Sequence, residues 1–205
     1  MNKNEVVGYV ATECLRNQRP VTIRAIRPED RGLVIDALRN VSADSLYLRF
    51  FSGKTKFTDH ELRQTTEVDF VNVVALVAVL EEDGHARIVG GGRYIRTEAP
   101  GADKGAEVAF LIDDAHQGLG IGSHLFKHLV AIARASGITR LEAEVLRANE
   151  GMLRLFSRSG LPVTRTATSD SVHVIIELTA ETAATNGGPE SPSPPAGRPL
   201  TGGTA

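Results

Sequence analysis

The segment that decides the fold is residues 107–123, which read Glu107-Val108-Ala109-Phe110-Leu111-Ile112-Asp113-Asp114-Ala115-His116-Gln117-Gly118-Leu119-Gly120-Ile121-Gly122-Ser123. This pattern predicts a strand, a short turn, a glycine-rich loop and then a helix. Backbone N–H groups in the first turn of a helix have no partner within the helix and lie at the positive end of its dipole. Glycines there let an oxyanion approach the main chain closely. We therefore expect this loop to hold a phosphate or pyrophosphate group.

The spacing of the glycines distinguishes between kinds of phosphate-binding loop. A Rossmann loop has Gly-x-Gly-x-x-Gly directly after its strand and an acidic residue about 20 positions later. Here Gly118, Gly120 and Gly122 alternate, and four residues separate them from the expected strand. Glu142 and Glu144 lie in the interior of a later strand rather than at its end. A P-loop is excluded because no Gly-Lys-Ser/Thr follows.

Two motifs carry a family resemblance. The loop Gln117-Gly118-Leu119-Gly120-Ile121-Gly122 resembles the Gln/Arg-x-x-Gly-x-Gly/Ala signature of the GNAT superfamily of acyl-CoA-dependent N-acyltransferases. The later segment Asn149-Glu150-Gly151-Met152-Leu153-Arg154-Leu155-Phe156-Ser157-Arg158-Ser159-Gly160-Leu161 is similar to the Asn-x-x-Met-x-x-Leu-Tyr/Phe-x-x-x-Gly-Phe helix of that superfamily. By this resemblance the anionic ligand of the loop is the pyrophosphate of acetyl-CoA.

The resemblance covers residues 20–180, most of the chain. Residues 21–30 and 42–51 look like the acetyltransferase domain of bacterial protein lysine acetyltransferases. The implied fold is α/β (α+β), with a mixed, mostly antiparallel twisted sheet that carries helices on both faces. Better-known members fuse this domain to a regulatory domain, for which we expect no room here. Relatives without a regulatory domain act on varied amines, so the resemblance supports a protein lysine as the acceptor less strongly.

Length and composition fit one catalytic domain with tails. Residues 1–19 are expected to form an N-terminal extension with an extra strand, and residues 20–180 the GNAT domain. Residues 181–205, rich in Gly, Pro, Ser and Thr, are expected to form a disordered tail. The net charge of −2 gives no electrostatic reason to expect nucleic acid or an anionic membrane as partner. A lone Cys14 excludes an internal disulfide, and without a signal peptide or a long apolar run the expected location is the cytoplasm.

The expected secondary structure begins with a hairpin and continues with helices. The hairpin joins residues 11–15 and 21–26, and helices follow at 28–40, 42–51 and 58–68, the last opened by a capping box at Thr58. Strands are expected at 72–82, 86–98, 104–113, 139–146, 162–168 and 171–178, with a helix after the glycine loop and another from Asn149. The run Gly90-Gly91-Gly92 inside a strand indicates either a plain bulge or a close approach of substrate or cofactor to the backbone.

Glu107 is the candidate general base for acetyl transfer to an amine. A lysine-type amine with a pKa near about 10.4 is mostly protonated at neutral pH, so a base has to remove a proton before the amine can attack. A strand rises about 3.3 Å per residue, which puts Glu107 on the order of 13 Å from Leu111 and favours a relay through water. Related protein acetyltransferases carry a glutamate in a similar context. The competing interpretation is a strand-end carboxylate that is merely solvated.

The resemblance also implies the residues that contact acetyl-CoA and the acceptor. Those expected at acetyl-CoA are Leu111, Ile112, Gln117, Gly118, Leu119, Gly120, Ile121, Gly122, Ser123, Asn149 and Phe156. Arg49, Phe50 and Phe51 lie where the family builds its acceptor wall, although an aromatic pair there also suits a core. Asn149 has a helix-capping role available as well.

Phe156 occupies the position where many family members place a tyrosine that protonates the departing thiolate. Phenylalanine has no proton to give, so the thiolate has to leave as an anion held by backbone N–H groups. We expect Phe156 to pack beside the cofactor arm or in the core.

Several residues invite chemical interpretations that their surroundings do not support. His124 and His128 are four residues apart on one helix face and could bind a metal, but no third ligand accompanies them. We expect them on a partly exposed face, with no metal. His116 lies beside the loop and is interpreted as a turn residue that can reach a phosphate. Nothing around Cys14 resembles an activated thiol.

The sequence thus predicts an acetyl-CoA-dependent N-acetyltransferase that transfers directly to a primary amine. The favoured acceptor is a protein lysine side chain, and a small-molecule amine is the alternative. A second alternative belongs to a different functional class. It is a non-catalytic acyl-CoA-binding sensor, which would not need the missing tyrosine. Nucleic acid, membrane and metal are not expected to take part, and a homodimer is left open.

Overall fold

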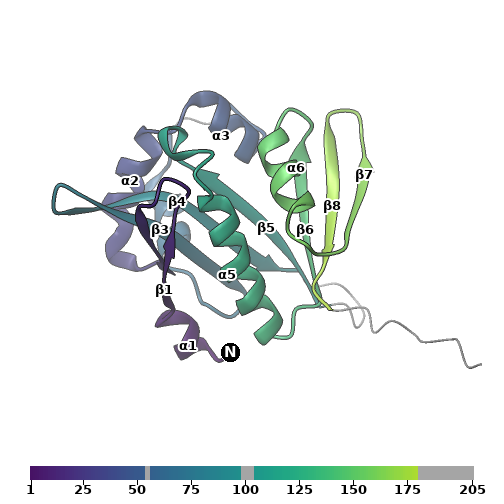
Figure 1. Ribbon diagram of the computed structural model, residues 1–205, viewed down its shortest axis with the longest axis horizontal. Helices are drawn as coiled ribbons and strands as arrows, with labels where there is room; N and C mark the ends of the chain where they lie inside the picture. The colour runs from purple at the N-terminus through teal and green to yellow at the C-terminus, as the bar shows by residue number, and fades with distance from the viewer. Residues whose placement is uncertain (54–55, 98–103, 180–205) are drawn as a thin grey trace, which may run out of the picture.

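The computed structural model describes residues 1–53, 56–97 and 104–179 (Figure 1). The strands in this part of the chain are β1 (Val10–Cys14), β2 (Pro20–Ala25), β3 (Val73–Glu82), β4 (His85–Arg96), β5 (Gly105–Ile112), β6 (Arg140–Leu146), β7 (Val163–Ala167) and β8 (Ser171–Glu177). The helices are α1 (Lys3–Val7), α2 (Arg31–Arg39), α3 (Ala43–Phe50), α4 (Asp59–Thr66), α5 (Ile121–Ala135) and α6 (Glu150–Ser157), with 3-10 turns η1 (Pro28–Asp30) and η2 (Asp114–His116). The expected tail, residues 181–205, lies outside the described residues.

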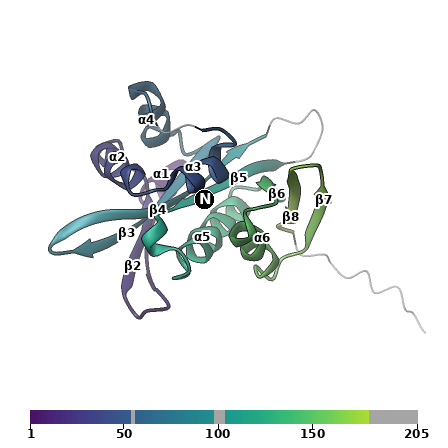
Figure 2. The same cartoon turned by 90° about the horizontal axis from the view of Figure 1, so that it is seen from above.

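The strands form one sheet in the order β1-β2-β3-β4-β5-β6-β8-β7. Neighbouring strands are antiparallel except for β5 and β6, which are parallel. α2, α3 and α4 lie on one face of the sheet, and α5 and α6 lie on the other (Figure 2). The predicted architecture, a mixed and mostly antiparallel sheet with helices on both faces, is confirmed.

β3 explains why both faces of the sheet are covered. Successive side chains of a strand point to opposite faces, so a run of apolar residues buries both. Val74 and Leu76 belong to the larger core under α5, whereas Ala75 and Val77 belong to a second core under α2 and α4. The apolar sequence of β3 therefore holds the two helical layers on one sheet.

α6 is held on the sheet by an aromatic cluster. Phe156 is 0% exposed, and its ring centroid lies 5.4 Å from that of Phe126 on α5 and 6.4 Å from that of Phe110 on β5. Tilted and edge-to-face arrangements of this kind stabilise aromatic pairs beyond their buried area. Phe156 is therefore a core residue that fixes α6 against both α5 and β5.

β5 and β6 separate shortly after they begin. Their parallel pairing joins residues 105–107 to residues 140–142 and stops there. Beyond that point β5 is paired only with β4, and β6 only with β8, so the two strands diverge toward their C-terminal ends (Figure 1). A wedge opens between them, and it lies between the C-terminal end of α3 and the N-terminal end of α6.

The glycine run of β4 is explained by close packing. A Cβ on Gly90 would lie 2.7 Å from Ile112 Cδ1, and one on Gly92 would lie 2.5 Å from Phe110 Cδ1. The register between β3 and β4 shifts directly before the run, opposite Ala78 and Val79, so a bulge, one of the two alternatives that the sequence offered, is present.

The first residues of the chain contain a helix that the sequence did not predict. α1 is five residues long and is opened by a capping box between Asn2 and Glu5. A helix of little more than one turn is too short for its periodicity to be detected, which is why it was missed. The expected hairpin is present, because Val10–Cys14 pairs antiparallel with residues 20–24. The division of this part of the chain into an N-terminal extension, residues 1–19, and a GNAT domain that begins at residue 20 stays a prediction.

The expectation for the histidines of α5 was wrong for His128. Its side chain is 7% exposed rather than partly exposed, and its Nε2 lies 3.0 Å from a carboxylate oxygen of Glu13 on β1. His124 Nδ1 lies 3.3 Å from the same carboxylate, and Lys127 Nζ donates to it at 2.9 Å. The hydrogen bond from Lys127 contributes most to lowering the pKa of Glu13, and burial lowers the pKa of His128. The pair therefore anchors β1 to α5.

Replacing Phe156 by Ala should lower the free energy of unfolding by about 3–5 kcal/mol, because the ring is fully buried among other aromatic rings. Tyr47→Ala is the matched control, since that ring is 49% exposed, and its effect should stay within about 0.5 kcal/mol. Urea denaturation measures both. Equal losses in the two variants would contradict the placement of Phe156 in the core.

Candidate functional site

The glycine loop leads into the start of α5, where backbone N–H groups are free to donate hydrogen bonds to a ligand. Gly118 and Gly120 have φ values of 77° and 97°, a left-handed conformation that favours glycine. Gly120 is the N-cap of α5, and no side chain caps this end of the helix. The N–H groups of Ile121, Gly122 and Ser123 therefore have neither a helical partner nor a capping oxygen. Such an arrangement suits a bound anion.

These donors line a cavity of about 370 Å³, which we call the loop pocket. It extends from the end of β5 across the loop to α6. Of the residues expected at acetyl-CoA, it includes Leu111, Ile112, Gln117, Gly118, Gly120, Ile121, Gly122, Ser123 and Asn149. Leu119 is not among its lining residues, because its side chain packs against the core and its carbonyl accepts a hydrogen bond from the N–H of Arg16. Phe156 lines a second, adjoining cavity instead.

Three arginines that sequence reasoning missed give the loop pocket a positive rim. Arg16 comes from the hairpin between β1 and β2, and its Nη1 donates to the carbonyl of Gly118 at 2.8 Å. Arg154 and Arg158 come from α6 and the residue that caps it, and all three side chains are exposed. Such a rim favours a ligand with several phosphates. The two α6 arginines lie inside the quoted motif, but no local pattern shows that Arg16 contacts a loop 102 residues away.

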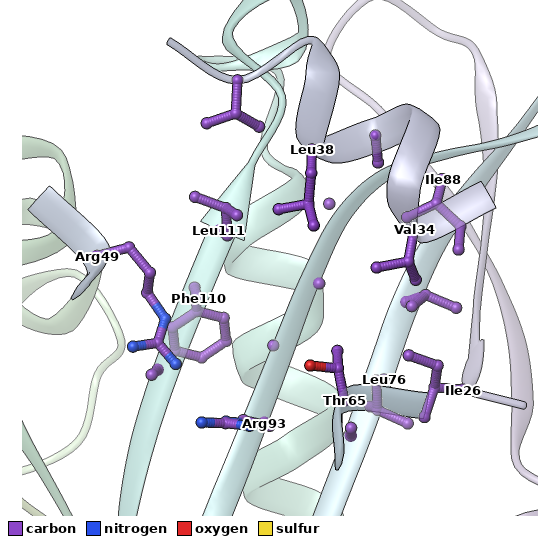
Figure 3. Close-up of a pocket in the computed structure, with 18 of the residues that line it drawn as sticks. Ile26, Val34, Leu38, Arg49, Thr65, Leu76, Ile88, Arg93, Phe110 and Leu111 are labelled. Atoms are coloured by element: carbon purple, nitrogen blue, oxygen red, sulfur yellow. The ribbon is translucent and has the colours of Figure 1, made fainter. Parts of the chain in front are cut away.

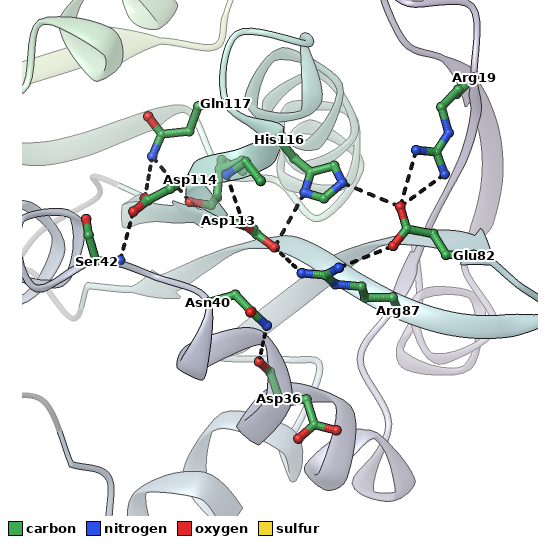
Figure 4. Close-up of polar contacts among 12 residues, drawn as sticks. Arg19, Asp36, Asn40, Ser42, Glu82, Arg87, Asp113, Asp114, His116 and Gln117 are labelled. Atoms are coloured by element: carbon green, nitrogen blue, oxygen red, sulfur yellow. Dashed lines mark hydrogen bonds and ion pairs between the residues drawn. The ribbon is translucent and has the colours of Figure 1, made fainter.

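Gln117 connects the loop to α3 instead of pointing at the open donors. Its Nε2 donates to Asp114 Oδ1 at 3.0 Å, and Asp114 in turn accepts from the N–H of Ser42 at 2.8 Å (Figure 4). Asp114 also accepts from Ser45 Oγ at 2.6 Å. Because Ser42 is the N-cap of α3, the acidic residue holds the beginning of that helix. The signature glutamine thus contributes to positioning α3 beside the loop.

Glu107 and the expected acceptor residues meet in the adjoining cavity of about 330 Å³, which we call the wedge pocket because it fills the gap between β5 and β6. It is lined by Glu107, by Arg49, Phe50 and Phe51 at the end of α3, and by Asn149, Met152 and Phe156. Arg49, Asn149 and Met152 line the loop pocket as well, so the two cavities share a boundary.

The carboxylate of Glu107 is exposed at the start of the wedge. Within the described residues it makes no hydrogen bond or ion pair, and it interacts electrostatically with Arg49. A carboxylate in this state is available to accept a proton. Asn149 performs the expected capping role, since its Oδ1 accepts from the N–H of Met152 at 3.1 Å and fixes the start of α6.

His116 is buried between two carboxylates and has a structural role. Its ring is 8% exposed and lies between Asp113 and Glu82, with Nδ1 3.4 Å from Asp113 Oδ2 and Nε2 3.7 Å from Glu82 Oε1 (Figure 4). Arg87 bridges the same two carboxylates at 2.9 Å and 3.2 Å. This cluster holds η2 against β3 and β4, which places the turn that leads into the glycine loop.

Neither a metal centre nor a membrane span is found in the described parts of the chain. No group of three or more His, Cys, Asp or Glu side chains among residues 1–53, 56–97 and 104–179 is arranged to hold a metal ion. None of the helices described is long and apolar enough to cross a bilayer.

The fold agrees with comparisons to known proteins. Residues 40–161 match the acetyltransferase (GNAT) family. An acetyltransferase of Pseudomonas aeruginosa is 32% identical over 173 residues, which cover 84% of this chain and 91% of that protein. Acetyltransferase Pat of Mycolicibacterium smegmatis is 33% identical over 138 residues, which cover 67% of this chain but 40% of that protein. The crystal structure of the GNAT domain of S. lividans PAT matches with a TM-score of 0.74 at 34% identity, covering 82% of this chain and 96% of that one.

The chain belongs to the GNAT acetyltransferase family. It is an acetyl-CoA-dependent N-acetyltransferase, and the GNAT fold that the sequence predicted is confirmed. The roles of the individual site residues stay predictions, which their placement in two adjoining cavities makes testable.

Replacing Ser123 by Asp should weaken acetyl-CoA binding at least about tenfold, because a negative charge would face a pyrophosphate held at the start of α5. The same change favours the helix itself, since acidic residues stabilise a helix N-terminus, so loss of folding is not expected. Ser123→Asn is the neutral control of nearly the same shape. Calorimetric titration with acetyl-CoA measures both variants. An unchanged affinity in Ser123→Asp would remove these donors from the binding site.

Proposed function

We propose that this enzyme transfers the acetyl group of acetyl-CoA directly to the side-chain amine of a protein lysine, with Glu107 as the general base. The observation that carries the proposal is the position of Glu107. Its exposed carboxylate, which has no hydrogen-bond or ion-pair partner among the described residues, shares the wedge pocket with Arg49, Phe50 and Phe51. The lysine acceptor is supported by the resemblance of residues 21–30 and 42–51 to bacterial protein lysine acetyltransferases.

The residues present fit acetyl-CoA as the cosubstrate. The uncapped N–H groups of Ile121, Gly122 and Ser123 suit its pyrophosphate, and Arg16 and Arg158 suit its further phosphate charge. The cavity continues from these donors to Asn149 and Met152, which also line the wedge pocket. The pantetheine arm would follow this path, and the thioester would lie where the two cavities meet. Acetyl-CoA supplies an acyl group already activated as a thioester.

Glu107 would remove the proton that the amine loses during acetyl transfer. The nitrogen lone pair forms a bond to the acyl carbon, the bond between that carbon and sulfur breaks, and the amine loses a proton. Glu107 accepts this proton. It lies at the start of the wedge, whereas Leu111 at the far end of β5 lines the loop pocket, so a water molecule has to relay the proton across the gap. The protonated Glu107 returns its proton to solvent, to which it is exposed.

The leaving thiolate does not receive a proton from Phe156. That ring is fully buried and carries no ionisable group. A thiol with a pKa near about 8.5 leaves as its anion, and backbone N–H groups stabilise such an anion. The absence of a tyrosine at this position is therefore compatible with catalysis.

Replacing Glu107 by Gln should lower kcat for a lysine peptide about 10²–10⁴-fold at pH 7, because the shape is kept and the basic function is lost. Acetyl-CoA affinity should change little. Much of the loss should return at high pH, where more of the lysine amine is already neutral. Glu144→Gln is the matched control, since this residue lines the same pocket but bonds to Ser171 and His173. Steady-state rates measured from pH 7 to pH 10 test the assignment, and full activity of Glu107→Gln at pH 7 would leave Glu107 as a solvated carboxylate.

Replacing Phe156 by Tyr should leave kcat within a few-fold of the wild-type value, since the thiolate does not need an acid here. A free-thiol assay of coenzyme A release measures the rate, and urea denaturation checks that the added hydroxyl does not unfold the core. A gain of orders of magnitude in Phe156→Tyr would show that protonation of the thiolate limits the natural enzyme.

A further inference from the structure

A third cavity lies between the sheet and the helices α2 and α4, and it is predominantly apolar. Its volume is about 330 Å³. Its apolar lining includes Ile26, Val34, Leu38, Phe57, Val77 and Ile88. Gly91 forms part of its floor, where a side chain would have room, because a Cβ there would meet only the carbonyl oxygen of Leu76 at 3.5 Å. We call this cavity the apolar pocket.

Two guanidinium groups lie at one end of the apolar pocket. Arg49 reaches it from α3 and Arg93 from β4, and both side chains are partly buried (Figure 3). Across the described residues, neither makes a hydrogen bond or an ion pair, and the recorded contact of Arg49 is with the Phe50 ring, 5.0 Å from its centroid. Burial, followed by repulsion from Arg93, lowers the pKa of Arg49 to about 10.

The acidic residues of the same lining do not neutralise these two cations. Asp113 binds Arg87 at 2.9 Å and accepts a hydrogen bond from the N–H of Ala115. Glu61 accepts hydrogen bonds from the N–H and the hydroxyl of Thr58 at the start of α4. Two like charges that are partly desolvated and unpaired are unfavourable, and an oxyanion bound between them would relieve the repulsion. Arginine is well suited to hold a carboxylate through two parallel hydrogen bonds.

The guanidinium pair lies next to the proposed base. Arg93 on β4 is directly opposite Ala109 on β5, and Glu107 is two residues from Ala109 on the same face of the sheet. Diagonal neighbours of this kind are about 7–8 Å apart. Arg49 lines the wedge pocket together with Glu107 and also lines the apolar pocket. The order in space is therefore Glu107, then the two arginines, then the apolar wall.

We propose that the acceptor site also takes a small amine that carries a carboxylate beside the amine and a compact apolar body, which is the chemistry of an apolar α-amino acid. This inference rests on the proposed acetyl transfer with Glu107 as base. Arg49 and Arg93 hold the carboxylate, the side chain fills the apolar pocket, and the amine points toward Glu107 and the wedge. The new bond joins the amine nitrogen to the acetyl carbon, the bond from that carbon to sulfur breaks, and Glu107 takes the proton through water.

The carboxylate subsite can be tested by binding alone, without turnover. 4-Methylpentanoate, which has the apolar body and the carboxylate of leucine but no amine, should bind the wild-type enzyme with a Kd of about 1 mM. Arg49→Met and Arg93→Met should each weaken this binding about 10–100-fold. Arg63→Met is the matched control, because that arginine is exposed on α4 and does not line the pocket. Gly91→Val should also block binding by filling the cavity floor. Isothermal titration calorimetry measures all of these.

Acetylation rates then test whether the carboxylate that binds in this subsite belongs to the acceptor. The wild-type kcat/KM for leucine should exceed that for leucinamide about tenfold or more, and Arg93→Met should abolish the preference. 4-Methylpentanoate should compete with leucine. Failure of 4-methylpentanoate to bind, equal affinity in Arg93→Met and wild type, or a preference for leucinamide would each overturn the proposal. If 4-methylpentanoate binds as expected but no amine is acetylated, the proposed function fails while the carboxylate subsite stands.

Discussion

The early end of the hydrogen bonding between β5 and β6 is the constraint on which the rest of the site depends. A parallel pair that continued along its full length would close the sheet and leave no place for a ligand between the strands. Because pairing stops at Glu107 and Glu142, the strands diverge, and the gap is bounded by α3 on one side and by α6 on the other. The loss of these backbone hydrogen bonds has to be offset elsewhere. Each strand keeps its other neighbour, and Phe156 fixes α6 beside the gap.

The wedge pocket also separates two surfaces that differ in polarity. On the side of α5 and α6 the surface offers backbone N–H groups and exposed arginines, which suit a highly charged ligand. On the side of α2, α3 and α4 the surface is apolar, and at its edge lie two guanidinium groups that make no hydrogen bond or ion pair in the part of the chain that the structure describes. Glu107 stands at the start of the gap that connects these surfaces. Under the proposed function, a thioester approaching from one side and an amine approaching from the other would meet there.

Much of the fold could be predicted from the sequence because its signals are local. Thr58 with Glu61 marks the start of α4, the glycines at 118, 120 and 122 mark the loop, and a continuous apolar run marks β3. Most candidate site residues likewise lie in two motifs, and Arg49, Phe50 and Phe51 lie in a third segment, residues 42–51. The structure places all of these candidates except Leu119 around two adjoining cavities. Contacts over long sequence distances leave no such signal. Arg16 on the loop, Glu13 beneath His128, and Arg93 beside Arg49 depend on which hairpin lies next to which helix, and α1 is too short to have a detectable period.

Asp114 belongs at once to the turn before the glycine loop and to the start of α3, because its two carboxylate oxygens bind Ser42, Ser45 and Gln117. The acidic side chain therefore connects the glycine loop to the helix that carries Arg49. Neither element can shift without stretching the same three bonds. A displacement of the glycine loop is therefore transmitted to α3 through one carboxylate, and the rigidity of the loop and that of the helix carrying Arg49 are linked.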